Sequence, residues 1–113
     1  PAGNYARAAK KTIEAWSQPG KLGQNFTMPW GAELPGPACA LMITQDAAIH
    51  GWDLAKATGQ TIELSSDVLK VLEEFAPKSI PPARDMGVFG PEKQAPASAS
   101  AIDKLAAFSG RTV

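Results

Sequence analysis

Apolar residues recur at helical spacing in four stretches of this chain, and residues rich in glycine, proline and serine separate these stretches. The first stretch covers 2–17, where apolar side chains recur every three or four positions with Arg, Lys and Glu between them. The same reasoning predicts helices over about 37–58, 66–76 and 100–109. We therefore expect a mainly α protein.

Residues typical of helix ends support these boundaries. Gly59 suits the left-handed position that follows the last turn of the second helix. Ser65 or Ser66 can cap the start of the third helix, because a serine hydroxyl accepts a hydrogen bond from a free backbone N–H in the first turn. Ser100 and Asp103 resemble a capping box at the start of the fourth helix, with Asp in place of Glu.

The connections between the predicted helices contain many glycine and proline residues. Three glycines and two prolines in 21–36 exclude a regular helix there, whereas a short extended piece at 25–28 fits the sequence. The stretch that begins with Pro81 and Pro82 and runs to residue 100 lacks periodicity and is predicted to be a connector. With no internal repeat, residues 1–113 are expected to form a single domain.

Composition and charge exclude several classes of function. Eleven basic and eleven acidic residues cancel, so the chain lacks the positive charge that nucleic acids or an anionic membrane attract. No apolar run reaches the length of a membrane span, and the first residues do not resemble a secretory signal. The single cysteine, Cys39, excludes an internal disulfide and fits a reducing compartment. We expect a cytoplasmic protein without nucleic-acid or membrane partners.

The second predicted helix carries the main candidate for chemistry. His50 is the only histidine, and Asp46 precedes it by about one helical turn, so both side chains lie on one helix face. Asp53 falls within roughly 60° of both on a helical wheel. Apolar residues lie around the same direction, namely Cys39, Met42, Ile43, Ile49 and Ala57. We therefore expect the three polar groups to face the protein interior, where they must be paired or coordinated.

An imidazole and a carboxylate one turn apart can bind a single divalent metal ion. We predict Asp46 and His50 as metal ligands, and Asp53 as the acceptor that holds the other ring nitrogen of His50 without touching the metal. The alternative is a histidine paired with a carboxylate and no metal. A metal normally needs at least three protein ligands, so the pair is expected to be part of a site. Zinc suits such ligands best, with nickel and manganese as alternatives.

The opposite side of the second helix carries small residues, Thr44, Ala48, Gly51 and Ala55. Small residues let another helix or another subunit approach closely, so this helix is expected to have neighbours on both sides. The tryptophans are predicted to anchor the core and the turns rather than to stack on a ligand. The thiol of Cys39 is predicted to be a buried apolar filler.

Three motifs in this chain, taken together, resemble those of a known protein superfamily. They are the helical motif Asp46-x-x-x-His50-x-Trp52-Asp53-Leu54-Ala55-x-Ala57-Thr58-Gly59, the turn Met28-Pro29-Trp30-Gly31, and the C-terminal Ile102-Asp103-Lys104-Leu105-Ala-Ala-Phe-x-Gly110-Arg111. Together they resemble the actinobacterial branch of the DinB-like superfamily, which includes mycothiol-dependent maleylpyruvate isomerase. The resemblance spans nearly all of this chain and matches the latter part of a full-length member.

The resemblance implies a DinB-like four-helix bundle with a divalent metal near one end of its core. Members of the family bind the metal through one histidine from an early helix and a later pair, and Asp46 and His50 match the later pair. The early histidine has no counterpart here, and the chain opens with Pro1 in place of a starting methionine. We therefore expect the C-terminal part of an incomplete bundle, completed by a missing N-terminal segment, a separate chain or a second copy in a homodimer.

Two functions remain open at this point. The resemblance implies a metal-dependent enzyme that acts on a small-molecule substrate, with mycothiol as the thiol of an isomerase or transferase. The alternative is a non-catalytic half-bundle that pairs with another chain or with itself, in which His50 and Asp46 form a structural pair. Neither alternative assigns a catalytic residue.

Overall fold

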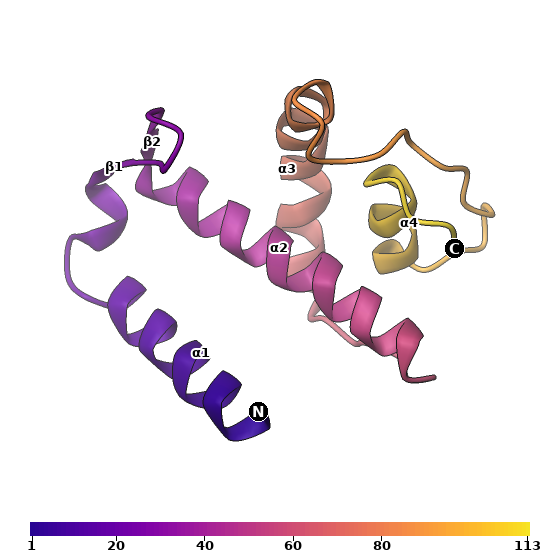
Figure 1. Cartoon of the computed structure of the whole chain (residues 1–113), viewed down its shortest axis with the longest axis horizontal. Coiled ribbons are helices and arrows are strands. Elements are labelled where there is room, and N and C mark those ends of the chain that lie inside the picture. Colours follow the sequence, from indigo (N-terminus) through magenta and orange to yellow (C-terminus); the bar gives the residue numbers. More distant parts are fainter. The chain divides into compact units, whose positions relative to one another are not determined.

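Helices form most of the computed structural model, which describes all residues of the chain from Pro1 to Val113 (Figure 1). The α-helices are α1 (Ala2–Trp16), α2 (Gly36–Ala57), α3 (Ser66–Asp85) and α4 (Ala101–Phe108). A 3-10 helix, η1 (Lys21–Gly23), and two short strands, β1 (Asn25–Thr27) and β2 (Glu33–Pro35), lie between α1 and α2. The prediction of a mainly α protein is confirmed. No helix is both long and apolar enough to cross a membrane.

The chain divides into two compact units, Pro1–Ala40 and Leu41–Val113, and the boundary falls within α2. The expectation of a single domain over 1–113 stays a prediction, because two compact units can belong to one domain.

The first unit contains α1 and a two-stranded antiparallel hairpin. Phe26 of β1 pairs with Leu34 of β2, and the ring of Trp16 packs edge-on against the ring of Phe26 with 5.4 Å between centroids. The extended piece expected at 25–28 is therefore confirmed. The second strand was not predicted. Pro35 is tolerated at its end because each strand of a two-stranded sheet is an edge strand.

The core of the second unit is built from one side of each of its helices. Buried residues of α2, α3 and α4 form a single apolar cluster, and three further side chains from the connections pack against it. The cluster consists of Ala48, Ile49, Trp52, Leu72, Ala76, Ile80, Ile102, Leu105 and Ala106, with Ile62, Leu64 and Phe89 at its edge. This core holds α2 in place and so determines which of its faces remains open.

Helix α3 is longer than the sequence predicted. We expected it to end near residue 76 and Pro81 to lie in a connector, but the helix continues to Asp85 and includes three prolines. A proline inside a helix removes one hydrogen bond and crowds the preceding turn. The burial of Ile80, which is 0% exposed, and a 3.1 Å hydrogen bond from Ser79 Oγ to Gln45 Oε1 on α2 offset that cost. The connector therefore begins only after α3, at Met86.

The predicted serine caps and the left-handed glycine after α2 are confirmed. Gly59 after α2 has a φ of 69° and Gly110 after α4 a φ of 104°, a region that glycine enters without strain. The side chains of Ser65 and Ser100 each accept a hydrogen bond from the backbone N–H three residues further on. These ends depend on local chemistry alone, which is why the sequence predicts them well.

Candidate functional site

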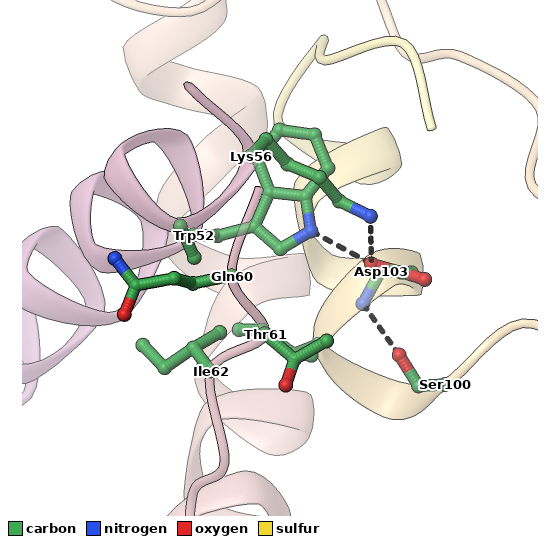
Figure 2. Close-up of a pocket in the computed structure, with 9 residues that line it drawn as sticks. Trp52, Lys56, Gln60, Thr61, Ile62, Ser100 and Asp103 are labelled. Carbon is green, nitrogen blue, oxygen red and sulfur yellow. Dashed lines mark hydrogen bonds and ion pairs between the residues drawn. The ribbon is translucent and has the colours of Figure 1, made fainter. Parts of the chain in front are cut away.

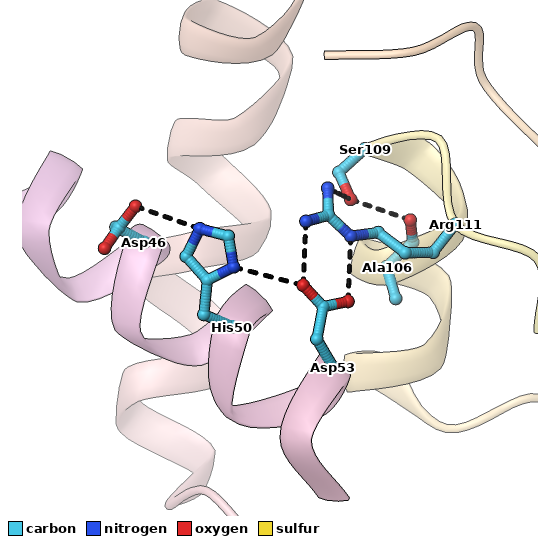
Figure 3. A network of polar contacts seen from close by, with 6 residues as sticks. All are labelled: Asp46, His50, Asp53, Ala106, Ser109 and Arg111. Atoms are coloured by element: carbon cyan, nitrogen blue, oxygen red, sulfur yellow. Dashed lines mark hydrogen bonds and ion pairs between the residues drawn. The ribbon is translucent and has the colours of Figure 1, made fainter. Parts of the chain in front are cut away.

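His50 lies between two carboxylates on one face of α2 (Figure 3). Its Nε2 is 3.4 Å from Asp46 Oδ1, and its Nδ1 is 3.1 Å from Asp53 Oδ2. Residues three and four positions apart are neighbours on a helix surface, so one carboxylate falls on each side of the imidazole along the helix. The prediction that these three side chains share one face is confirmed.

The prediction that this face points into the protein is wrong. The side chains of His50 and Asp46 are 63% and 73% exposed, and Asp53 is half-buried. The core instead covers the small-residue side of α2, where Ala48 is 4% and Ala55 is 9% exposed. Both sides of the helix carry apolar residues, so periodicity alone did not distinguish them. The buried side combines the large Ile49 and Trp52, which fill the core, with the small Ala48 and Ala55.

Close approach on the small-residue side is visible at Gly51. A Cβ atom at this position would lie 2.7 Å from Cδ1 of Ile62, which belongs to the connection between α2 and α3. The close neighbour here is a connecting segment, whereas another helix or another subunit was expected. Neighbours on both sides of α2 are not found, because the face with His50 is exposed to solvent.

Asp53 is held by Arg111, which follows α4. Arg111 Nε donates to Asp53 Oδ1 at 3.0 Å and Nη2 donates to Oδ2 at 2.9 Å, a bidentate arrangement. These hydrogen bonds lower the pKa of Asp53, burial opposes the shift, and the contact with His50 lowers the pKa further. Asp53 also raises the pKa of Arg111. Asp53 is therefore an anion whose two oxygens are both engaged.

This role of Arg111 was not predicted from the sequence. The residue resembled an ordinary end of the last helix, and no spacing rule connects it with Asp53, which lies 58 positions earlier. The remaining contact of the guanidinium is a 3.3 Å hydrogen bond from Nη1 to Ser109 Oγ. The one available signal was the C-terminal Gly110-Arg111 in the motif set, which marked the residue without indicating a partner.

The contact with Asp53 orients the ring of His50. An ionised carboxylate only accepts hydrogen bonds, so a hydrogen bond between Asp53 and Nδ1 requires the proton to be on Nδ1. In the neutral imidazole the lone pair is then on Nε2, which faces Asp46. The position of Asp53 therefore fits the role predicted for it, an acceptor that sets the tautomer of a metal-binding histidine.

The separation between Asp46 and His50 fits two ligands of one metal ion. Two donors about 2.0–2.1 Å from a tetrahedral ion lie roughly 3.3 Å from each other. The distance between Asp46 Oδ1 and His50 Nε2 is 3.4 Å. No group of three or more His, Cys, Asp or Glu side chains suited to a metal occurs in the chain. The pair supplies two donors, and the same distance also suits a direct contact between a carboxylate and a protonated imidazole.

A second polar cluster lies at the C-terminal end of α2, around a pocket of about 90 Å³ (Figure 2). Trp52 Nε1 donates to Asp103 Oδ1 at 2.7 Å, and Lys56 Nζ lies 3.9 Å from the same oxygen and above the Trp52 ring. The polar groups of Trp52, Lys56 and Asp103 therefore have one another as partners. Trp52 is a core anchor, as predicted, whereas its partner Asp103 was not predicted from the sequence.

The remaining predicted residues lie in the first unit. Cys39 is buried and 5% exposed, with its Sγ 3.9 Å from the carbonyl oxygen of Leu34, so the prediction of a buried filler is confirmed. Trp16 packs on Phe26 as an anchor. Trp30, in the turn between the strands, is 58% exposed, so the prediction that it anchors that turn is wrong.

Comparison with known proteins reveals relatives and no named family. The chain is 38% identical over 112 residues to the proteins named "Uncharacterized protein MT0763" and "Uncharacterized protein Rv0738", from two strains of Mycobacterium tuberculosis. Each match covers 96% of this chain and 60% of the relative, so the chain spans about 60% of the length of these curated relatives. No family model matches the chain, and no solved structure matches it.

Proposed function

We propose that this chain is part of a DinB-like metalloprotein in which Asp46 and His50 bind one divalent metal ion. The observation that carries the proposal is the 3.4 Å separation of Asp46 Oδ1 and His50 Nε2. The orientation of the ring by Asp53 supports it, because the lone pair of Nε2 is directed to the side of Asp46. The exposure of both side chains leaves them accessible to a metal and to ligands from other segments.

The proposed metal is zinc, with nickel and manganese as alternatives, because all three accept imidazole and carboxylate ligands. A bound divalent ion lowers the pKa of a coordinated water or thiol and so supplies a nucleophile near neutral pH. Asp46 and His50 would hold the ion, and Asp53 with Arg111 would keep His50 in position. Both side chains are exposed, so a small substrate can reach the pair from solvent.

We further propose a mycothiol-dependent isomerase or transferase that acts on a small molecule in the cytoplasm. The support is the motif resemblance together with the source of the relatives, since mycobacteria belong to the actinobacteria. The buried free thiol of Cys39 fits a reducing compartment.

Metal analysis of the purified protein tests the metal site. We expect the wild-type protein to retain a divalent ion after dialysis, and His50→Ala and Asp46→Asn to lose it. Asp85→Asn is the matched control, because Asp85 is also an exposed helical aspartate but lies at the end of α3. Unchanged metal content in His50→Ala would rule out this pair as the site.

The second candidate function is a non-catalytic interaction module, and α1 favours it. No residue of α1 is buried, and Tyr5 and Ile13 on its apolar face are 73% and 66% exposed. A partner chain or a further segment of the protein would cover this face, with Asp46 and His50 as a structural pair. This function predicts self-association or capture of a partner, so a well-folded monomer in sedimentation experiments counts against it.

A further inference from the structure

The face of α2 that carries Asp46 and His50 also exposes large apolar side chains. Ile43 is 45% and Leu54 is 66% exposed, and Ala47 lies exposed between them. Together with His50 these residues follow one another at intervals of four, three and four positions. Such spacing places them in one line along a helix, as at the seam of a coiled coil. His50 therefore lies within this strip and Asp46 beside it, on a face that the other residues of the second unit leave uncovered.

The strip is symmetric about its midpoint. Ile43 lies four positions before Ala47, and Leu54 lies four positions after His50. The midpoint of the strip therefore falls between Ala47 and His50. If a two-fold axis passes through that point, Ile43 of one copy meets Leu54 of the other, and Ala47 meets His50. A surface that pairs with itself in this way is what an isologous dimer requires. Alanine near the axis lets the two helices approach closely.

The ligand set is incomplete in the same place. Asp46 and His50 supply two donors, whereas a zinc ion normally takes four. A two-fold axis through the strip would bring a second Asp46 and a second His50 next to the first pair. The four donors would be two neutral imidazoles and two carboxylates, whose two negative charges balance a divalent cation. Neither Asp53 nor Arg111 has to move, because Asp53 contacts the other ring nitrogen, Nδ1, and Arg111 contacts only Asp53.

We propose that two copies of this chain pair antiparallel through the Ile43–Leu54 strip of α2 and share one divalent metal ion, bound by Asp46 and His50 of both copies. The proposal rests on the proposed function and adds a partner and a ligand set to it. Without the metal, the two Asp46 carboxylates would lie close together and repel each other. Dimerisation is therefore coupled to metal binding.

Analytical ultracentrifugation combined with zinc titration tests this proposal on the whole protein. We expect one zinc ion for every two chains, a dimer in the presence of zinc, and a monomer after chelation. His50→Ala abolishes both binding and dimerisation. Leu54→Lys, which places a charge in the strip and leaves all ligands intact, yields a monomer with at least tenfold weaker zinc binding. Met86→Lys is the matched control, since Met86 is 67% exposed outside the strip, and it behaves as wild type.

The results of these measurements distinguish a failure of the shared site from a failure of metal binding by Asp46 and His50. One zinc ion per monomer, lost in His50→Ala but retained in Leu54→Lys, would overturn the shared site and leave the proposed function standing, with the other ligands supplied by another segment. A dimer that persists in Leu54→Lys or after chelation would also overturn the shared site. No zinc binding by the wild-type protein would overturn both proposals.

Discussion

Arg111 donates two parallel hydrogen bonds to Asp53, a residue 58 positions earlier in the sequence, and so fastens the segment after α4 to α2. Asp53 also contacts Nδ1 of His50. The orientation of the only histidine therefore depends on a cation that comes from the last residues of the chain. Through these contacts, the position of the C-terminal segment affects the orientation of His50 in the candidate metal-binding pair.

Replacing Arg111 by methionine should destabilise the protein by about 0.5–1.5 kcal/mol. A bidentate pair with a half-buried carboxylate is worth more than an open surface pair, but solvent screens part of its energy. Urea denaturation measures the change. Lys10→Met is the control, because Lys10 and Glu14 form an exposed pair at 3.9 Å and its loss should cost less than about 0.5 kcal/mol. Equal effects of the two substitutions would contradict a special role for Arg111.

The Asp53–Arg111 pair should make stability fall in acid. Arg111 and His50, the charged and titratable groups that contact Asp53, lower the pKa of Asp53 in the folded protein, whereas the unfolded chain has the ordinary value of 3.8. The stabilisation is therefore complete above that value and is lost as the pH falls through the lower pKa of the folded state. We expect the difference in unfolding free energy between wild type and Asp53→Asn to shrink on acidification. A difference that stays constant from neutral pH to below 3.8 would refute this linkage.

Truncation of Ile80 tests whether α3 continues beyond residue 76. A side chain buried completely between helices should cost about 2–5 kcal/mol when isoleucine is replaced by alanine. Val71→Ala, on the same helix but 41% exposed, should cost less than about 1 kcal/mol. Thermal or chemical unfolding gives both values. If Ile80 instead lay in a surface connector, its replacement would have as small an effect as that of Val71.

Gly36 should resist replacement by alanine. A Cβ atom there would lie 2.5 Å from the carbonyl oxygen of Leu22, and a backbone atom cannot move aside as a flexible side chain does. We expect Gly36→Ala to destabilise the hairpin unit by roughly 1–3 kcal/mol. Gly23→Ala is the matched control, because no atom lies within 4 Å of its added Cβ. Hydrogen exchange of the β1 and β2 amides reports on this unit, and unchanged protection in Gly36→Ala would exclude the clash.

Local features of this protein follow from its sequence. Serine caps, the glycines after α2 and α4, and the stacking of Asp46 and His50 one turn apart each depend on residues within a few positions of one another. Backbone geometry and short-range hydrogen bonds determine such features, and these forces are the same in any fold. The mainly helical class was predictable for the same reason.

Only the tertiary structure decided which face of α2 is buried, how far α3 extends, and that Arg111 binds Asp53. Apolar residues lie on both sides of α2, and the covered side is the one on which Ile49 and Trp52 fill the core beside Ala48 and Ala55. The prolines of α3 are tolerated because Ile80 is buried in the core. These outcomes depend on contacts between residues far apart in the sequence, and the balance of their energies is set only when the helices pack together.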